Sequence, residues 1–208
     1  SRALLHTDAV QGFMKEPFSA KTLGADMISM SGHKVHAPKG IGALYIRQGL
    51  KLPAHILGGG QEEGMRSGTE PMPQIAAFGE AVRIAKAEMP EANKRMEALR
   101  AQCVQTLTNA VPDIVFLGGG SAHILSLSLP GYRSEVLMNY LEAKGIYVSK
   151  SSACKRGKRS HVLEAIGAPD KVIDGALRVS FSRYTTAEEC AYFCEALAAA
   201  RKELYPSL

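Results

Sequence analysis

The chain has 208 residues, of which 46% are hydrophobic, and its formal net charge at pH 7 is +5. This length and apolar content can bury a substantial core, in one domain or in two small ones. No apolar run approaches the roughly 20 residues of a membrane span, and no signal peptide or membrane partner is expected. The mild positive charge fits a phosphate-bearing ligand or an acidic partner and argues only weakly for nucleic acid. Four cysteines without dense spacing indicate reduced thiols and a cytoplasmic setting.

The first part of the chain alternates short β-rich runs with turns. Strands are predicted at 2–6, 26–30 and 42–47, with a weaker one at 54–57. Together they predict part of a larger, mostly parallel sheet. Three successive glycines then open a loop that ends at Thr69. Taken alone, this loop is more typical of a plain turn, because it matches no phosphate-loop or dinucleotide pattern.

From Pro73 to about Ala110 the apolar residues recur at helical spacing. Pro90 interrupts this segment and is expected to separate or kink two helices. We place a domain boundary at this proline, which divides the chain into residues 1–89 and residues 90–208.

The remainder of the chain is predicted to be an α+β unit. Ser134 is expected to cap a helix that Gly145 closes. Thr186 and Glu189 have the spacing of a capping box at the start of the last helix. The predicted strands of this unit are 114–117, 124–129, 146–148 and 177–182.

Lys34 belongs to a short polar turn, Ser31-Gly32-His33-Lys34, between two β-rich runs. Such a turn brings a hydroxyl, an imidazole and an amine together at a strand end. A lysine held there can supply the free amine that a carbonyl cofactor needs to form a Schiff base. A solvated surface lysine is the commoner case for any single lysine, so the assignment depends on the neighbours of Lys34.

Asp8 is placed at the carboxyl end of the first strand, the side on which open α/β sheets bind ligands. A carboxylate there can hold the protonated ring nitrogen of pyridoxal phosphate, so that the ring withdraws electrons from a bound substrate. An aspartate after a strand is also commonly a helix cap or a turn residue. Asp8 and Lys34 together, each at a strand end, favour the cofactor.

Cys154 lies in a loop, 149–159, that is rich in cations and poor in apolar residues. This environment favours a thiolate and predicts a nucleophile, whereas a structural cysteine usually has apolar neighbours. The other cysteines fall on apolar helical stripes and are expected in the core, without a metal, because the nearby sequence offers no further ligands. They are Cys103, Cys190 and Cys194.

Arg178 lies in a predicted strand whose apolar residues alternate with polar ones. Leu177, Val179 and Phe181 are expected on one face, and Arg178 on the other with Ser180. An arginine beside small hydroxyl residues leaves room for a ligand carboxylate, which the guanidinium can bind with two hydrogen bonds. A salt bridge on a solvent face fits the same pattern equally well.

Five stretches carry a resemblance to a known family, and they span nearly the whole chain in the family's order. At these residues the sequence closely resembles the cysteine desulfurases, pyridoxal-phosphate enzymes of fold type I in the class V aminotransferase superfamily. Jointly the motifs are highly specific. The stretches are HTDAVQ (6–11), SGHKVHAPKGIGALYIR (31–47), GGGQEEGMRSGT (58–69), SSAC (151–154) and LRVSFSRYTT (177–186).

The resemblance implies an α/β fold that corresponds to the C-terminal part of a fold type I enzyme. Residues 1–89 would form the C-terminal part of the large pyridoxal-phosphate domain, with a partial, mostly parallel sheet, and residues 90–208 the small α+β domain. The N-terminal half of a family member would carry the aromatic ring-stacking residue and a phosphate-binding turn. We expect that half to be supplied as a separate chain where this one is found ordered, and the fragment alone to be inactive.

The resemblance also assigns roles to residues of the predicted site. Lys34 and Cys154 are the expected catalytic residues, with His33 as a local acid–base group and a phosphate contact. Arg178 is expected to bind the substrate carboxylate, and Thr69 to reach the cofactor phosphate of a neighbouring subunit. The expected ligands of pyridoxal 5′-phosphate are Asp8, Gln11, Ser31, His33, Lys34 and Thr69.

The implied activity is the removal of sulfur from L-cysteine, which gives L-alanine and a persulfide on Cys154. A homodimer with shared active sites would pass this sulfur to an acceptor protein, such as an iron–sulfur scaffold, for iron–sulfur cluster or thio-cofactor synthesis. The basic run at 155–159 is more typical of a solvated face, but it could also dock an acidic acceptor.

Two departures from the family pattern and several alternatives accompany this interpretation. The family usually has glycine where Ser151 stands and Ser or Thr where Lys150 stands, which affects the expected acceptor more than the cofactor chemistry. Another class V enzyme, a selenocysteine lyase or an aminotransferase, shares most of the motifs, and an aminotransferase has no need of Cys154. A non-catalytic binding module that uses the basic loop for nucleic acid is the other alternative. It would bind no cofactor, and its affinity for nucleic acid would fall steeply with salt concentration.

Overall fold

A computed structural model describes residues 3–150 and 159–206 of the chain. The chain divides into two compact units, Ser1–Pro90 and Glu91–Leu208, and each is described by itself. Their assignment to the large and small domains of the family stays a prediction. No helix among the described residues is long and apolar enough to cross a membrane.

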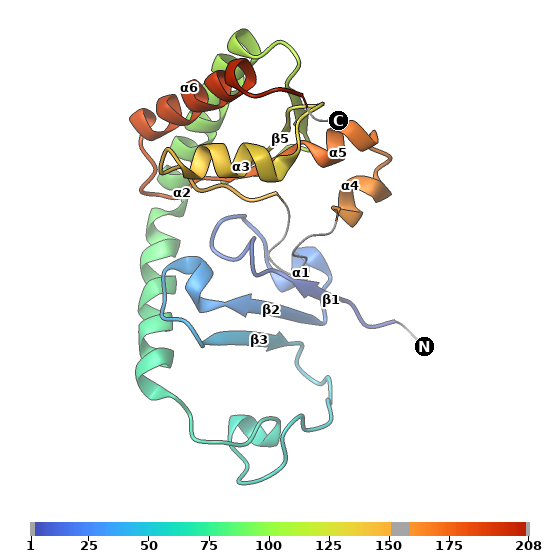
Figure 1. The fold of residues 1–208 in the computed structure, drawn as a ribbon. Coiled ribbons are helices and arrows are strands. Elements are labelled where there is room, and N and C mark those ends of the chain that lie inside the picture. Colours follow the sequence, from blue (N-terminus) through green and yellow to red (C-terminus); the bar gives the residue numbers. More distant parts are fainter. Residues whose placement is uncertain (1–2, 151–158, 207–208) are drawn as a thin grey trace. The chain divides into compact units, whose positions relative to one another are not determined.

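The first unit contains a three-stranded sheet in the order β1-β2-β3 (Figure 1). Its strands are β1 (His6–Asp8), β2 (Met27–Ser31) and β3 (Gly42–Ile46). The β1–β2 pair is parallel and the β2–β3 pair is antiparallel. Within the described residues the sheet is therefore mixed, whereas the sequence predicted a mostly parallel one. The second and third predicted strands are confirmed, and the first lies later than the predicted 2–6.

A small core packs on this sheet. Helix α1 (Ala20–Leu23) begins at Ser19, whose hydroxyl accepts a hydrogen bond from the backbone N–H of Thr22. The buried residues of this core are Ala9, Ala25 and Ile28, with Phe18, Ala20 and Met30 packed against them.

The loop after β3 carries single-turn 3₁₀ helix η2 (Glu62–Gly64) and one isolated parallel bridge between Ile56 and Arg66. The weak strand predicted at 54–57 is thus reduced to a single bridge. It does not extend because the chain turns through glycines with positive φ, among them Gly58 and Gly60.

Helix α2 (Met72–Ala110) runs without interruption through Pro90, so the expected separation into two helices is wrong. Proline removes one backbone hydrogen bond and frees the carbonyl of the residue four positions earlier, Lys86. Pro90 and Lys86 are both exposed, so water can satisfy this carbonyl and the helix tolerates the proline. The predicted burial of Cys103 is confirmed, and Met96 and Leu99 of the same helix are buried as well.

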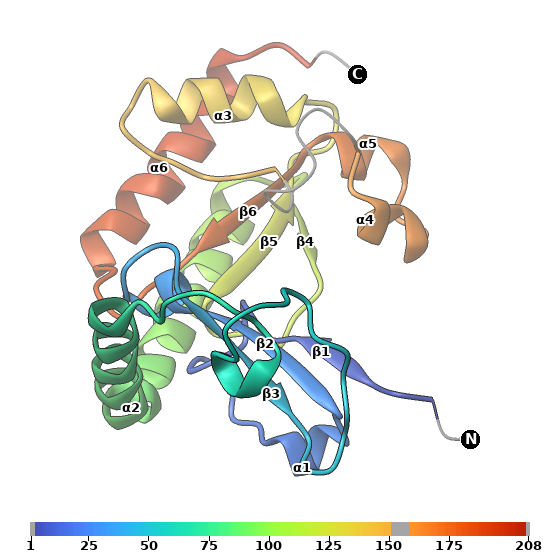
Figure 2. The same cartoon turned by 90° about the horizontal axis from the view of Figure 1, so that it is seen from below.

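The second unit is built on an antiparallel sheet in the order β4-β5-β6 (Figure 2). Its strands are β4 (Val115–Leu117), β5 (Ile124–Ser128) and β6 (Ala176–Ser180). Helices α3 (Ser134–Glu142) and α6 (Ala187–Glu203) pack against one another and share one buried cluster with this sheet and the end of α2. The alternation predicted for β6 is confirmed, because Leu177 and Val179 are buried in this cluster.

Two short helices, α4 (His161–Ala165) and α5 (Asp170–Asp174), precede β6. The predicted capping box of α6 is confirmed: Thr186 Oγ1 accepts from the N–H of Glu189, and Glu189 Oε2 accepts from the N–H of Thr186.

Two local predictions in this unit are wrong. Residues 146–148 do not form a strand; a single antiparallel bridge joins Ser149 to Arg178 instead. Ser134 is the first residue of α3, and Arg133 is its N-cap without a side-chain capping bond. The run Ile146-Tyr147-Val148, with two β-branched residues and one aromatic residue, resembles a strand in composition, but an extended run becomes a strand only where a partner pairs along its length.

Candidate active site

The parallel pairing of β1 and β2 brings two predicted site residues to the same edge of the sheet. Asp8 is the last residue of β1 and lies opposite Ser29 of β2. Ser31 is the last residue of β2, two positions further along. Because parallel strands end on the same side, Asp8 and Ser31 both lie at the carboxyl edge, where open α/β sheets bind ligands.

The turn after β2 is the single-turn 3₁₀ helix η1 (Gly32–Val35), which carries His33 and Lys34. Gly32 is fully enclosed by its neighbours: a Cβ atom at this position would lie 2.8 Å from Cγ2 of Ile41 and 3.1 Å from its carbonyl oxygen. The absence of a side chain at Gly32 therefore permits the tight turn that positions Lys34 just beyond the strand end.

Lys34 is half-buried, and its amine makes no hydrogen bond or ion pair with any described residue. The same turn holds His33, whose Nδ1 lies 2.8 Å from the Ser31 hydroxyl. This bond orients the imidazole and leaves its Nε2 atom for another partner. The turn therefore groups a free amine, an imidazole and a hydroxyl, as the sequence predicted.

Asp8 is exposed, and its Oδ1 atom accepts a hydrogen bond of 2.9 Å from the N–H of Val10. Among the described residues no donor contacts its Oδ2 atom. Ala9 continues the pairing with β2 through its N–H, which donates to the carbonyl of Ser29 at 3.0 Å. Gln11 lies in the turn that follows and is half-buried. The carboxylate of Asp8 is thus held at the sheet edge with one oxygen available to a ligand.

Thr69 lies in the loop between η2 and α2 and is exposed. The preceding residue, Gly68, has a φ of 125° and donates its N–H to the side-chain oxygen of Gln61 at 3.2 Å. This bond joins the two ends of the segment from Gln61 to Gly68. The expected contact of Thr69 with a neighbouring subunit stays a prediction.

Arg178 belongs to the second unit, on the face of β6 opposite Leu177 and Val179. Its Nε atom is buried and has no hydrogen-bond partner in the structure, and no described residue forms an ion pair with its guanidinium. A buried donor without a partner is costly, especially on a charged group. The alternative of a structural salt bridge is therefore not supported among the described residues, and an anionic ligand would satisfy this group.

Cys154 and the residues around it, 151–158, lie outside the described residues. The other three cysteines are buried, as predicted. Contact with the Cys194 thiol and burial raise the pKa of Cys103, and burial raises the pKa of Cys190 to about 12. The thiols of Cys103 and Cys190 therefore stay protonated and unreactive at neutral pH. No group of histidine, cysteine or acidic residues able to hold a metal is found in the described part of the chain.

Two contacts near the site were not predicted from the sequence. The ring nitrogen Nε2 of His6 lies 2.7 Å from the Ser29 hydroxyl. Asp26, fully buried, pairs with Arg47 across 21 residues of sequence. A charged residue at the start of an apolar run was a signal that Asp26 needed a partner, but nothing in the pattern names Arg47.

Comparisons with known proteins identify the family of the chain. The family model for class V aminotransferases, "Aminotransferase class-V", matches residues 1–193. The chain belongs to this family. Class V aminotransferases use pyridoxal phosphate, in agreement with the resemblance seen in the sequence.

Individual relatives narrow the resemblance within the class V aminotransferases. The chain is 41% identical over 192 residues to cysteine desulfurase 2 of Trichormus variabilis, covering 90% of this chain and 48% of the relative. It is 43% identical over 201 residues to cysteine desulfurase IscS of Tolumonas auensis, covering 92% of this chain and 48% of that relative. A solved NifS-like protein superposes with a TM-score of 0.87 at 40% identity, over 97% of this chain and 53% of that one. The chain thus spans about half the length of the curated relatives it matches.

Proposed function

We propose that the protein to which this chain contributes is a pyridoxal-phosphate-dependent cysteine desulfurase. The observation that carries the proposal is the free amine of Lys34 at the carboxyl edge of the sheet, in one turn with His33 and Ser31 and at the same edge as Asp8. An amine, a carboxylate, a hydroxyl and an imidazole are the groups needed to hold a phosphorylated aldehyde with a basic ring nitrogen. The similarity to cysteine desulfurases at about 40% identity supports the same assignment.

The residues of this edge fit pyridoxal phosphate by their chemistry. The Ser31 hydroxyl and the Nε2 atom of His33 would contact the phosphate, and the Asp8 carboxylate would hold the proton of the ring nitrogen. Gln11 would donate to the ring oxygen, and Lys34 would hold the aldehyde carbon. When bound, the cofactor supplies an electron-withdrawing ring that stabilises negative charge at the substrate Cα.

The remaining steps belong to groups of the chain and to the substrate. Arg178, whose buried Nε has no hydrogen-bond partner among the described residues, would bind the carboxylate of L-cysteine and orient the substrate. Lys34, once displaced by the substrate amine, would move a proton at Cα. His33 lies in the same turn and would act as a local acid–base group.

The sulfur transfer would use the Cys154 thiolate as the nucleophile. It would attack the sulfur of the substrate, so that a sulfur–sulfur bond forms and the bond from sulfur to substrate Cβ breaks. The electron pair of the broken bond would go to Cβ, which takes a proton and becomes the methyl group of L-alanine. The products are L-alanine and a persulfide on Cys154, and a sulfur-acceptor protein would then receive the terminal sulfur.

A pair of cysteine variants in the complete holoenzyme tests this proposal. Cys154→Ser should keep the cofactor absorbance but release no sulfide or alanine from L-cysteine. Cys190→Ala is the matched control, because Cys190 is buried with a pKa raised to about 12, and it should keep wild-type turnover. Retained turnover in Cys154→Ser would contradict the proposal and favour an aminotransferase; a strong preference for selenocysteine in the wild type would favour a selenocysteine lyase.

A further inference from the structure

Arg178 is the middle residue of a polar row that crosses three neighbouring segments of the second unit. In the register of the sheet it lies directly opposite Ser126 of β5. On the other side of β6 an antiparallel bridge places it directly opposite Ser149. The row therefore runs from Ser126 through Arg178 to Ser149.

The three side chains of this row belong to one face of the sheet. Residues that lie directly opposite each other in an antiparallel pair point to the same side. The alternate residues of β5 and β6 are buried in the core on the other face: Leu125, Leu127, Leu177 and Val179. The face that carries Arg178 is thus turned away from the buried cluster.

The hydrogen bonds of the ladder place both serines close to Arg178. The N–H of Ser149 donates to the carbonyl of Arg178 at 3.2 Å, and the N–H of Arg178 donates to the carbonyl of Ser149 at 2.5 Å. A residue that uses both backbone groups on one side forms a non-hydrogen-bonded pair on the other, where the side chains lie closest. Ser126 occupies that second position. The Cβ atoms of directly opposite residues are about 5 Å apart, so both hydroxyls can reach a group bound at the guanidinium.

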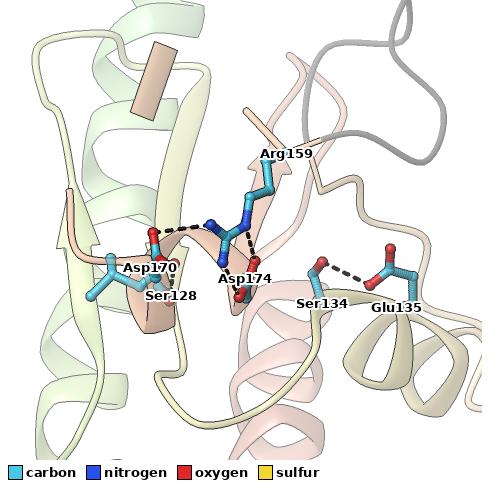
Figure 3. Close-up of polar contacts among 7 residues, drawn as sticks. Ser128, Ser134, Glu135, Arg159, Asp170 and Asp174 are labelled. Atoms are coloured by element: carbon cyan, nitrogen blue, oxygen red, sulfur yellow. Dashed lines mark hydrogen bonds and ion pairs between the residues drawn. The ribbon is translucent and has the colours of Figure 1, made fainter. Parts of the chain in front are cut away.

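The two hydroxyls are available to a ligand. Ser126 and Ser149 are half-buried, and neither hydroxyl makes a hydrogen bond with a described residue. Two residues further along β5, by contrast, the Ser128 hydroxyl is buried and donates to the carbonyl of Val172 in α5 at 2.7 Å (Figure 3). Helix α5 therefore covers the end of this face at Ser128, whereas Ser180, at the opposite end, is exposed.

We propose that the hydroxyls of Ser126 and Ser149 bind the α-carboxylate of the substrate together with the guanidinium of Arg178. This inference rests on the proposed function, in which Arg178 binds the carboxylate of L-cysteine. A carboxylate has about four acceptor positions on its two oxygens, and a bidentate guanidinium uses two of them. The other two are left for the serine hydroxyls, one from each side of the row. The row therefore selects an amino acid with a free carboxylate over an amine that lacks one.

Binding of L-cysteine and of cysteamine to the complete holoenzyme tests this assignment, because cysteamine lacks only the carboxylate. The background is Cys154→Ser, which prevents turnover in the proposed reaction, and the dissociation constants are read from the change in cofactor absorbance. Ser126→Ala and Ser149→Ala should each weaken the binding of L-cysteine about tenfold, because a hydrogen bond to a charged group is lost. Neither substitution should change the binding of cysteamine.

A matched pair of variants separates the hydroxyl of Ser126 from the shape of its side chain. Ser126→Thr keeps the hydroxyl and should bind L-cysteine nearly as well as the wild type. Ser126→Val has the shape of threonine without the hydroxyl and should lose as much affinity as Ser126→Ala. Ser128→Ala is the control on the same face of β5. Its hydroxyl is already bonded to Val172, so this variant should lower Tm and leave both dissociation constants unchanged.

The outcomes separate this inference from the proposed function. Wild-type binding of L-cysteine in Ser126→Ala or in Ser149→Ala, with weakened binding in Arg178→Ala, would overturn the role of that serine and leave the desulfurase assignment intact. An equal loss for cysteamine, or a loss in Ser126→Thr as large as in Ser126→Val, would also overturn it, because the hydroxyl would then not act on the carboxylate. A wild-type enzyme that forms no persulfide from L-cysteine would overturn the proposed function and this inference with it.

Discussion

Asp26 and Arg47 form an ion pair in which the carboxylate is fully buried and the guanidinium side is half exposed, with 2.6 Å between Oδ1 and Nε. The other carboxylate oxygen accepts the N–H of Leu5 at 2.9 Å. The backbone of Asp26 adds two more bonds: its N–H donates to the carbonyl of Leu5, and its carbonyl accepts from the N–H of Arg47, both at 2.8 Å. Asp26 therefore joins the residue before β1 and the residue after β3 to the start of β2.

Asp26→Asn should accordingly weaken the first unit. The substitution keeps the size of the side chain but removes the charge that Arg47 and the Leu5 N–H share, and we expect a loss of about 2 kcal/mol in the free energy of unfolding. Urea unfolding of the complete protein measures it. Asp113→Asn is the control, because its ion pair with Arg201 is exposed, and it should cost less than about 0.5 kcal/mol. Equal losses in the two variants would contradict the structural role of Asp26.

Lys34 should be the lysine that holds the cofactor. Borohydride reduction of the complete holoenzyme, followed by peptide mapping, should place the pyridoxyl group on Lys34. Lys39 lies five residues further along in the same connection, is exposed, and serves as the internal control. The expectation follows from the free amine of Lys34 beside His33 and Ser31 at the sheet edge. Label on Lys39, or on any other lysine, would remove the basis of the proposed site.

Much of the edge that holds Lys34 could be predicted because its signals are local. The apolar run before Ser31 and the glycine after it indicate a strand and a tight turn, and both are present. The last helix could be predicted equally well, since a capping box and an apolar stripe at helical spacing depend on residues only a few positions apart. Local chemistry therefore located the candidate residues of the first unit.

Contacts between distant residues could not be predicted in this way. Arg159 was grouped with a basic run as part of a solvated face, yet it pairs with Asp170 and Asp174, which lie beyond the next helix. Residues 146–148 have the composition of a strand, but their pairing depends on whether β6 extends alongside them. Partner choice across tens of residues depends on the packing of the whole unit, and the residue pattern of one segment does not encode it.

The pair between Arg159 and Asp174 gives a prediction for the dependence of stability on pH. The hydrogen bonds from Arg159 hold the pKa of the Asp174 carboxyl below its usual value, so the folded state binds this proton less readily than the unfolded state. The stabilisation is therefore present above the unfolded pKa of about 3.9 and is lost as the pH falls through the folded value. The difference in unfolding free energy between wild type and Asp174→Asn should be constant from about pH 7 to pH 5 and should shrink below about pH 4. A difference that stays the same down to about pH 3 would argue against this ion pair.

The chain expressed by itself should bind pyridoxal phosphate weakly and release no sulfide. Apolar side chains of the first unit are exposed, including Leu5 before β1 and Leu44 and Tyr45 in β3. Small sheets with uncovered apolar surface are marginally stable, and the candidate site occupies one edge of such a sheet. The test compares residues 1–208 alone with the complete protein, using cofactor titration and sulfide release. Activity equal to that of the complete protein would show that no further chain is needed.

Arg178 should contribute to substrate binding and little to folding. Its buried Nε has no partner among the described residues, so removing the guanidinium breaks no ion pair of the fold that the structure shows. Arg178→Ala should lower kcat/KM for L-cysteine by roughly 2–4 kcal/mol of transition-state binding, about 30-fold to 1,000-fold, with little change in Tm. Arg178→Lys should recover only part of this loss, because an ammonium cannot bind a carboxylate in the bidentate geometry. Arg100 is the matched control: its Nε donates to the carbonyl of Ile124 at 3.2 Å, so Arg100→Ala should lower Tm and leave kcat/KM unchanged. If Arg178→Ala instead lowers Tm strongly and leaves kcat/KM as in the wild type, Arg178 is a structural residue and the carboxylate must bind elsewhere.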